Sequence, residues 1–136
     1  MSTRLLVTGS RTWTDEQTVH TALESCRAYY GDDLVIVHGG AMGADLIAAR
    51  WCEHHGVTQE VHRAQWRRHG RSAGMVRNAA MIDTRPAGVL AFIKDNSPGA
   101  SQCAREAEAR GVPVNRTDAT TEIHQSVDQN SAEGLW

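Results

Sequence analysis

The 136-residue sequence has three cysteines, one lysine and no long apolar run. No hydrophobic segment approaches the ~20 residues of a transmembrane helix, and residues 1–10 lack the apolar centre of a secretory signal peptide. Cys26, Cys52 and Cys103 are odd in number and far apart, so we expect free thiols in the core rather than disulfides or a metal site. These absences favour a cytoplasmic protein that binds no metal and no membrane.

Several common catalytic and nucleotide-binding motifs are also missing. There is no Walker GxxxxGK[ST], and GSR rather than GxGxxG follows the first predicted strand. A P-loop NTPase and an ordinary NAD-dependent dehydrogenase are therefore disfavoured. The nucleophile elbow GxSxG, the zinc motif HExxH and the redox motif CxxC are absent as well.

Charge is unevenly spread in a composition typical of a single globular domain. The net charge is −2, but residues 117–136 hold four of the sixteen acidic residues and none of the fourteen basic ones, which leaves +2 on residues 1–116. Thirteen of those fourteen are arginines, a bias that suits phosphate binding and that a GC-rich genome would also produce. We predict one domain over residues 1–116 and a polar, acidic tail over 117–136. The tail is expected to be disordered or to form a short helix near 121–128.

Short apolar runs alternate with amphipathic segments along the first 115 residues. Alternation of this kind forms βαβ units with right-handed crossovers. We predict the α/β class: a three-layer Rossmann-like fold whose parallel five-stranded sheet has the order 3-2-1-4-5. The expected strands are 4–8, 34–38, 58–63, 88–93 and 112–115, and the expected helices are 15–30, 43–55, 72–82 and 100–110.

The most informative segment is LVIVHGGAMGAD, residues 34–45. An apolar strand runs into a glycine-rich turn that opens a helix, and the first N–H groups of such a helix form a natural anion site. Gly39, Gly40 and Gly43 permit a tight turn and a close approach of the backbone to a ligand. Asp45 is expected either to bond a ribose hydroxyl or to cap its own helix, with the cap favoured.

Ligands of open α/β sheets bind where the strand order reverses, here between the first and fourth strands. Four loops meet at this crevice, those near residues 9–11, 39–45, 64–70 and 94–101. Ser10 and Arg11 are suited to phosphate, although a plain turn with a solvated arginine is the alternative. Further along the chain, Ser97 is the expected cap of a second helix N-terminus.

The segment HRAQWRRHGRSAGMVRN, residues 62–78, places five arginines around Trp66. Basic residues interleaved with an aromatic ring bind single-stranded nucleic acid or hold a nucleotide whose base stacks on the ring. The alternative is a solvated loop with Trp66 at the edge of the core. Arg77 is expected to reach the crevice as a phosphate ligand, and Asn78 to brace a loop.

Three motifs together resemble the SLOG superfamily over about residues 4–115: GSR, VHGGAMGAD and W…G…AGMVRNAAM. This superfamily joins the DNA-processing DprA/Smf proteins and the LOG nucleotide phosphoribohydrolases. The chain looks most similar to its small, stand-alone bacterial and phage members of YspA type. The resemblance implies a Rossmann-like fold, a nucleotide or nucleotide-derived ligand at the crevice, and a homodimer with the helices near 72–82 and 100–110 as candidate surfaces.

One departure from the LOG pattern bears on catalysis. LOG enzymes carry PGGxGTxxE with a catalytic glutamate, whereas residues 98–103 here read PGASQC. Counted from Pro98, the position of the glutamate that would stabilise an oxocarbenium-like ribose is Glu106, while two glycines and the threonine of the motif are replaced by Ala100, Gln102 and Cys103. Asp45 and Asp95 are the other carboxylates that could serve this role. The turn GGAMGAD is also similar to that of DprA, which favours single-stranded DNA as a ligand.

Three functional hypotheses follow. The first is a sensor or sequestering module for a nucleotide or a nucleotide-derived ligand, with no certain cofactor. The second is a hydrolase that cleaves an N-glycosidic or phosphoester bond of a nucleotide, and the third is a single-strand DNA-binding protein. The ligand-binding candidates are Gly9, Ser10, Arg11, Gly39, Gly40, Ala41, Gly43, Asp45, Trp66, Arg77, Asn78, Lys94, Gly99 and Ser101.

Overall fold

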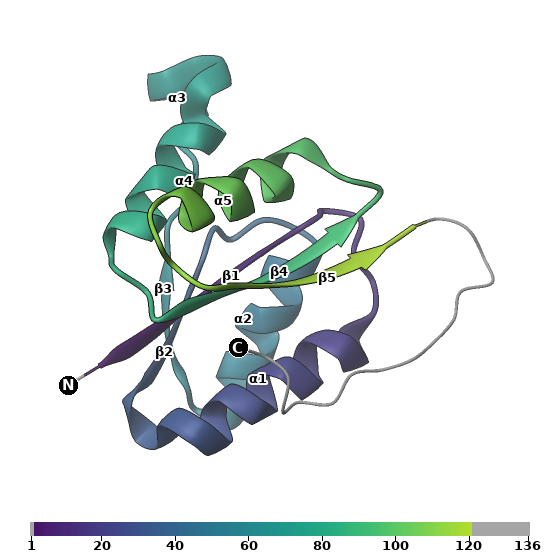
Figure 1. Ribbon diagram of the computed structural model, residues 1–136, viewed down its shortest axis with the longest axis vertical. Coiled ribbons are helices and arrows are strands. Elements are labelled where there is room, and N and C mark those ends of the chain that lie inside the picture. The colour runs from purple at the N-terminus through teal and green to yellow at the C-terminus, as the bar shows by residue number, and fades with distance from the viewer. Residues whose placement is uncertain (1, 121–136) are drawn as a thin grey trace.

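Five parallel strands form one sheet in the order β3-β2-β1-β4-β5, as predicted (Figure 1). The structure, a computed structural model, describes residues 2–120. The expectations for residues 121–136 lie outside this range. The strands are β1 (Thr3–Gly9), β2 (Leu34–His38), β3 (Thr58–Val61), β4 (Gly88–Lys94) and β5 (Val114–Ala119).

Helices cover both faces of the sheet and complete the predicted three-layer α/β fold (Figure 1). On one face lie α1 (Glu16–Tyr30) and α2 (Ala44–His55), and on the other lie α4 (Ala73–Asp83) and α5 (Pro98–Ala109). The single-turn helix α3 (Trp66–His69) protrudes beyond α4 (Figure 1). No helix within residues 2–120 is long and apolar enough to cross a membrane.

Local sequence explains where the helices begin and end. Asp15 caps α1 by accepting a hydrogen bond from the N–H of Thr18 at 3.2 Å. Gly56 ends α2 in the left-handed conformation, with φ 68°. Pro98, which needs no N–H partner in a first turn, opens α5.

Successive residues of the strands point to opposite faces, so the sheet separates two apolar cores. Leu5 and Phe92 pack with α1 and α2, whereas Leu6 and Val89 pack with α4 and α5. Both central strands are therefore buried on both sides, which explains their continuous apolar runs. The three cysteines are free and buried, as expected.

Two segments differ from the prediction. The last strand is Val114–Ala119 rather than 112–115, because its ladder with β4 continues to the pair Lys94 and Ala119 whatever the polarity of the side chains. Residues 117–119, assigned to the tail by composition, are thus part of the sheet. Part of the loop expected before residue 72 is helical, as α3 and the 3₁₀ turn Gly70–Ser72.

Candidate ligand-binding site

The loops after β1 and β4 are joined through a buried serine. Ser10 is 2% exposed, and its Oγ accepts a hydrogen bond from the N–H of Lys94 at 2.7 Å and pairs with the Oγ of Ser97. Its own N–H donates to the carbonyl oxygen of Phe92 at 2.9 Å. The structure thus brings these two predicted loops together, with the Ser10 hydroxyl already engaged within the protein.

Two glycines let the loop after β2 press against the loop after β1. A Cβ built on Gly43 would overlap the carbonyl oxygen of Ser10 and lie 2.8 Å from that of Arg11. Gly43 also has φ 80°, a conformation that L side chains rarely adopt. A Cβ on Gly9 would overlap the Cβ of Ala44, the first residue of α2. Glycine is needed at both positions for contact between protein segments, so these residues need no ligand to explain them.

The N–H groups of the glycine-rich loop are bonded within the protein. Gly39 and Ala41 both donate to Asp45 Oδ2, at 3.0 and 3.3 Å. Gly40 donates to His38 Nδ1 at 3.0 Å, and His38 Nε2 pairs with Gln59 Oε1 at 2.7 Å. This pattern corrects the expectation that Asp45 caps its helix: Gly43 is the N-cap of α2, and the Asp45 carboxyl braces the preceding loop instead.

Asp45 is a buried carboxyl with one oxygen unused. It is 5% exposed, and its Oδ1 has no hydrogen-bond partner within residues 2–120. Burial raises the pKa of Asp45, and the opposing effects of His38, the two loop N–H donors and Arg77 do not cancel it. The neutral carboxylic acid is therefore favoured relative to an ordinary aspartate.

A side-chain network connects the same loop to both helices of the other face. Arg77 on α4 donates from Nη1 to the carbonyl oxygen of Gly39 at 3.1 Å and from Nε to Asn78 Oδ1 at 2.9 Å. Asn78 in turn donates to Gln102 Oε1 on α5 at 2.9 Å. The expectation for Asn78 is corrected in detail, because it links Arg77 to α5 rather than holding a loop directly. Gln102 gave no sequence signal beyond its position near the start of α5.

The N-termini of α2 and α5 both lie at this edge of the sheet without a side-chain cap. Gly43 offers no side chain, and Ser97, the N-cap residue of α5, makes no capping hydrogen bond. The predicted cap role of Ser97 is therefore wrong, because its hydroxyl pairs with Ser10. Around these termini Lys94 and Ser101 are half-buried, whereas Arg11 and Gly99 are exposed.

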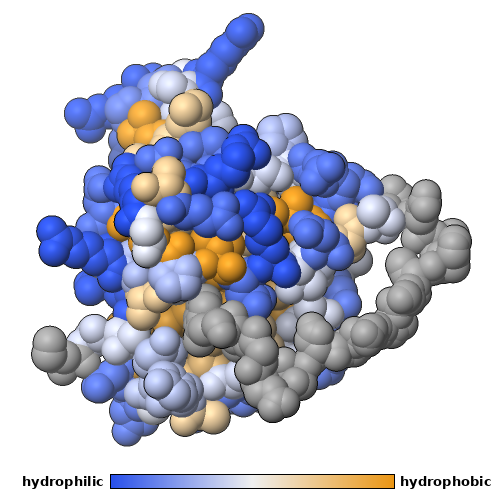
Figure 2. Space-filling model, viewed as in Figure 1, coloured by the Kyte–Doolittle hydropathy of each residue, from blue (hydrophilic) through white to orange (hydrophobic). Residues whose placement is uncertain are grey.

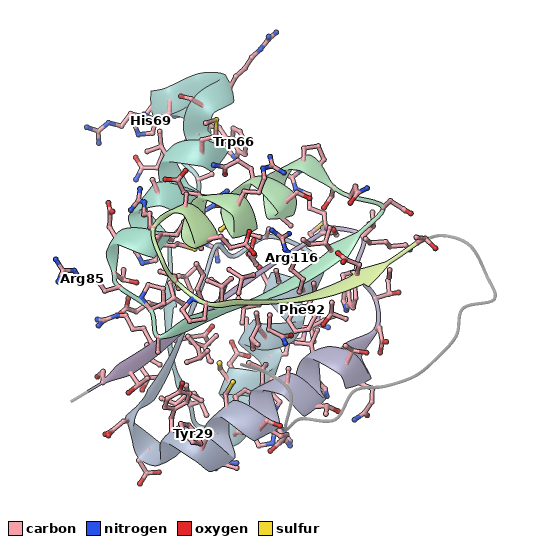
Figure 3. The ribbon with its side chains drawn as sticks, viewed as in Figure 1. Tyr29, Trp66, His69, Arg85, Phe92 and Arg116 are labelled. Atoms are coloured by element: carbon pink, nitrogen blue, oxygen red, sulfur yellow. The ribbon has the colours of Figure 1, made fainter. Side chains whose placement is uncertain are left out.

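Trp66 lies apart from these loops, with α3 and α4 at the protruding end of the molecule (Figure 3). It is 52% exposed, which rules out the alternative that it fills the edge of the core. Hydrophilic residues dominate the surface over α3 and α4, with small apolar areas among them (Figure 2). A structural role for Trp66 in the core is thus excluded, and its ligand role stays a prediction.

Cys103 is fully buried in the core beside Leu6 and Met81. Burial raises the pKa of its thiol to about 11, against a weaker lowering by a hydrogen bond with Thr8. The thiol is therefore protonated near neutral pH and is not an activated nucleophile. Asp95 is exposed in the turn after β4. Within residues 2–120 no cluster of three or more potential metal ligands occurs.

Comparison with known proteins identifies the family. Residues 3–69 match the YspA, cpYpsA-related SLOG family. The chain is 48% identical over 118 residues to the Gene 61 protein of Mycobacterium phage D29, covering 82% of this chain and 93% of that protein. The chain belongs to the SLOG superfamily. The phage relative confirms the predicted link to phage members, and its name assigns no activity to either protein.

The fold of this SLOG chain is also similar to that of a solved structure. It matches DNA processing protein A (DprA) from Streptococcus pneumoniae with a TM-score of 0.54 and 16% sequence identity. The match covers 83% of this chain but 58% of DprA, so the SLOG chain spans little more than half of the larger protein. At this identity the similarity supports the shared Rossmann-like fold alone.

Proposed function

We propose that this SLOG protein binds a nucleotide or a nucleotide-derived ligand at the edge formed by the loops after β1, β2 and β4, and acts as a sensor or sequestering module. The supporting observation is that two helix N-termini without side-chain caps contact one dipeptide. Ala44 at the start of α2 packs on Gly9, and Ser97 at the start of α5 bonds Ser10. Unpaired N–H groups and the helix dipole both favour an anion at such a position.

The observed contacts refine the roles within this proposal. The N–H groups of Gly39, Gly40 and Ala41 are already bonded, so the phosphate is assigned to the first turns of α2 and α5. Arg11 is exposed on the adjoining loop and supplies the pairing charge. Arg77 is assigned a positioning role, because two of its nitrogens hold Gly39 and Asn78.

A thermal-shift screen tests this proposal. Purified protein is heated with mono-, di- and cyclic nucleotides, NAD, ADP-ribose and short single-stranded DNA. A ligand at 100 times its Kd adds about 2.7 kcal/mol of stability, which for a domain of this size raises Tm by several degrees. We expect a selective nucleotide shift that is lost in Arg11→Ala and kept in Arg50→Ala, a matched exposed arginine on α2. No shift with any phosphorylated small molecule would contradict the proposal.

Hydrolysis of the bound nucleotide is a second candidate, favoured by Asp45. A buried carboxyl with a raised pKa and a free oxygen has the character of a general acid. Against it, residues 98–106 lack two glycines and the threonine of the LOG motif, and Glu106, at the position of its glutamate, already accepts a hydrogen bond from Arg110 Nε at 3.0 Å. Release of base or phosphate that stops in Asp45→Asn, while binding persists, would support hydrolysis. Recovery of the intact nucleotide after prolonged incubation with the protein would contradict hydrolysis.

Single-stranded nucleic acid is a third candidate, favoured by the protruding helix α3. The exposed Trp66 is preceded by exposed Arg63 and followed by exposed Arg67, Arg68 and Arg71. An aromatic ring among arginines offers stacking and phosphate pairing together. This hypothesis predicts an affinity that falls steeply with salt and drops when these arginines become alanine. An affinity that changes neither with salt concentration nor with the arginine substitutions would contradict single-strand binding.

A further inference from the structure

An exposed apolar strip runs from α3 to the first turn of α4. Trp66 is 52% exposed, Met75 59% and Val76 42%. The Trp66 ring lies against the start of α4, since a Cβ built on Gly74 would be 3.9 Å from its Cη2. Neighbouring apolar side chains that remain in contact with solvent mark an interaction surface, whereas isolated ones do not.

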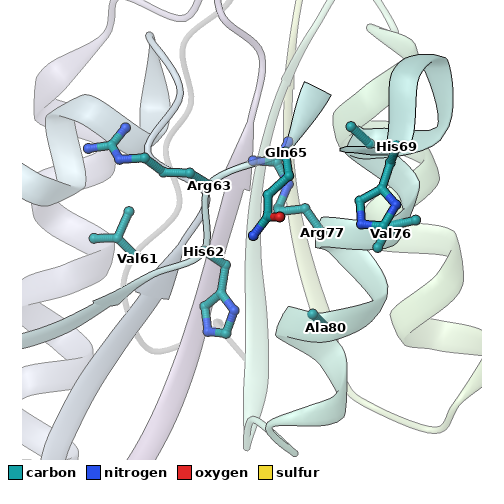
Figure 4. A pocket seen from close by; sticks show the side chains of 9 residues that line it. Val61, His62, Arg63, Gln65, His69, Val76, Arg77 and Ala80 are labelled. Atoms are coloured by element: carbon teal, nitrogen blue, oxygen red, sulfur yellow. The ribbon is translucent and has the colours of Figure 1, made fainter. Parts of the chain in front are cut away.

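A groove of about 290 Å³ adjoins this strip, between the end of β3 and α4 (Figure 4). Val76 lines the groove together with Val61 and Ala80, so the strip and the groove share a side chain. Together the strip and the groove form one partly apolar area, the α3–α4 surface. Most of its residues do not belong to the loops assigned above to the nucleotide.

Cationic side chains surround the α3–α4 surface. Residues 61–82 contain five arginines and no aspartate or glutamate. Arg67, Arg68 and Arg71 are exposed, and within residues 2–120 none of them forms a salt bridge. A second copy of this face would bring like charges together, so the face is not suited to pairing with itself. The partner that matches it is acidic and carries apolar side chains.

The chain contains a segment of this composition, residues 121–136. It has three acidic residues, no lysine or arginine, and four large apolar side chains, which are Ile123, Val127, Leu135 and Trp136. The segment begins just after β5. Its sixteen residues span up to about 53 Å when extended, whereas a domain of this size is about 35 Å across. The segment is therefore long enough to reach the α3–α4 surface.

We propose that the α3–α4 surface binds the chain's own segment 121–136. Apolar side chains of the segment pack on Trp66, Met75 and Val76, and its carboxylates lie near the surrounding arginines. Because both parts belong to one chain, their effective concentration is high and individually weak contacts suffice. The contact is independent of the proposed nucleotide site, and single-stranded DNA would have to compete with the segment for the same arginines.

The test measures paramagnetic broadening by NMR in the full chain. A nitroxide is attached to the thiol of Asn130→Cys, because the three native thiols are buried and do not compete for the label. We expect loss of the resonances of the Trp66 indole N–H and the Met75 amide. These signals should recover in part in 1 M salt, where the Debye length is about 3 Å and charge attraction is screened.

Two double variants distinguish a specific contact from general attraction between charges. Arg67→Gln with Arg71→Gln should restore the lost signals, because the segment loses its cationic partners. Arg27→Gln with Arg50→Gln removes the same charge from exposed positions of α1 and α2 and should leave the broadening unchanged. Met75→Ala keeps every charge and should also weaken the broadening, since apolar contact is lost. Equal broadening in the two double variants would overturn the proposal.

The remaining outcomes concern other occupants of the surface. Broadening centred on α1 and α2, or no broadening anywhere, would overturn the proposal. A mixture of isotope-labelled protein without nitroxide and unlabelled protein with nitroxide detects binding between copies. Signal loss in this mixture equal to that in the singly prepared sample would show that the segment binds a second copy, which would overturn the intramolecular contact.

Discussion

The two faces of the sheet are built from different side chains. The face under α1 and α2 is packed with large groups, among them Trp13 and Phe92, whose rings are tilted with centroids 5.6 Å apart. The core under α5 includes small residues such as Ala104 and Ala107. Only the second face carries the polar network from Arg77 through Asn78 to α5. One face thus supplies most of the apolar stabilisation, and the other positions the charges.

The largest expected effect tests this division of stability. Phe92→Ala on the first face should lower the free energy of unfolding by about 3–5 kcal/mol, because the cavity left beside Trp13 cannot be refilled. Met81→Ala on the second face should cost nearer 2 kcal/mol, since it removes a flexible side chain from a smaller cluster. Urea unfolding measures both values. A larger cost for Met81→Ala would contradict the comparison.

The contact between the loops after β1 and β2 is the next target. Gly43→Ala combines a positive φ with overlap on the Ser10 carbonyl, so it should cost about 2–5 kcal/mol and abolish nucleotide-dependent thermal shifts. Gly56→Ala has the same kind of φ but nothing within 4 Å of the new Cβ, so about 1–2 kcal/mol of backbone strain is expected. Equal costs for the two substitutions would show that the loop contact is not tightly packed.

Asp45 gives a smaller effect that depends on pH. Asp45→Ala leaves two buried N–H groups without an acceptor and should cost about 1–3 kcal/mol, whereas Asp45→Asn keeps an acceptor and should cost less. Because burial raises the pKa of Asp45, the native protein should lose stability as pH rises through that raised pKa. Between the ordinary pKa of aspartate and the raised pKa, the stability of the Asn variant should increase relative to that of the native protein. Urea unfolding at a series of pH values measures this difference. A difference in the free energy of unfolding between the two proteins that does not change with pH would contradict the raised pKa.

Near neutral pH the buried thiols provide the smallest effect, and they are a point where the two faces agree. Burial raises the pKa of Cys26, beside α2, and that of Cys103, on the other face, each to about 11 from the ordinary 9.0. Each thiol therefore adds stability that is complete below pH 9 and declines by up to about 1.4 kcal/mol per pH unit between 9 and 11. Cys26→Ala and Cys103→Ala should each reduce this alkaline slope equally. A variant that keeps the native slope would contradict burial of its thiol.

The sequence predicted the fold because the signals for it are local. The runs at residues 34–37 and 88–93 are apolar throughout, as is typical of buried parallel strands, and each is followed by glycine or proline at a helix start. The end of β5 was missed because β5 is mostly polar after Val114 and none of its residues is fully buried. An edge ladder is held by backbone bonds that side-chain polarity does not report.

The sequence predicted which loops lie at this edge of the sheet, and predicted less well how their residues contact one another. The βα loops that meet at one edge follow from the strand order, so the proximity of Gly9 and Ser10 to Gly43 could be predicted. Sequence spacing does not give the distances that decide side-chain hydrogen bonds. It therefore did not predict that Asp45 accepts hydrogen bonds from the N–H groups of its own loop, or that Ser97 pairs with Ser10.

The most direct test of the proposed function is isothermal titration calorimetry with the nucleotide that gives the largest thermal shift. The native protein and Arg50→Ala should bind it with the same Kd and one site per chain, and Arg11→Ala should bind it at least about tenfold more weakly because a charged phosphate contact is lost. Equal binding by Arg11→Ala, or no heat with the native protein, would contradict a nucleotide site at this edge of the sheet.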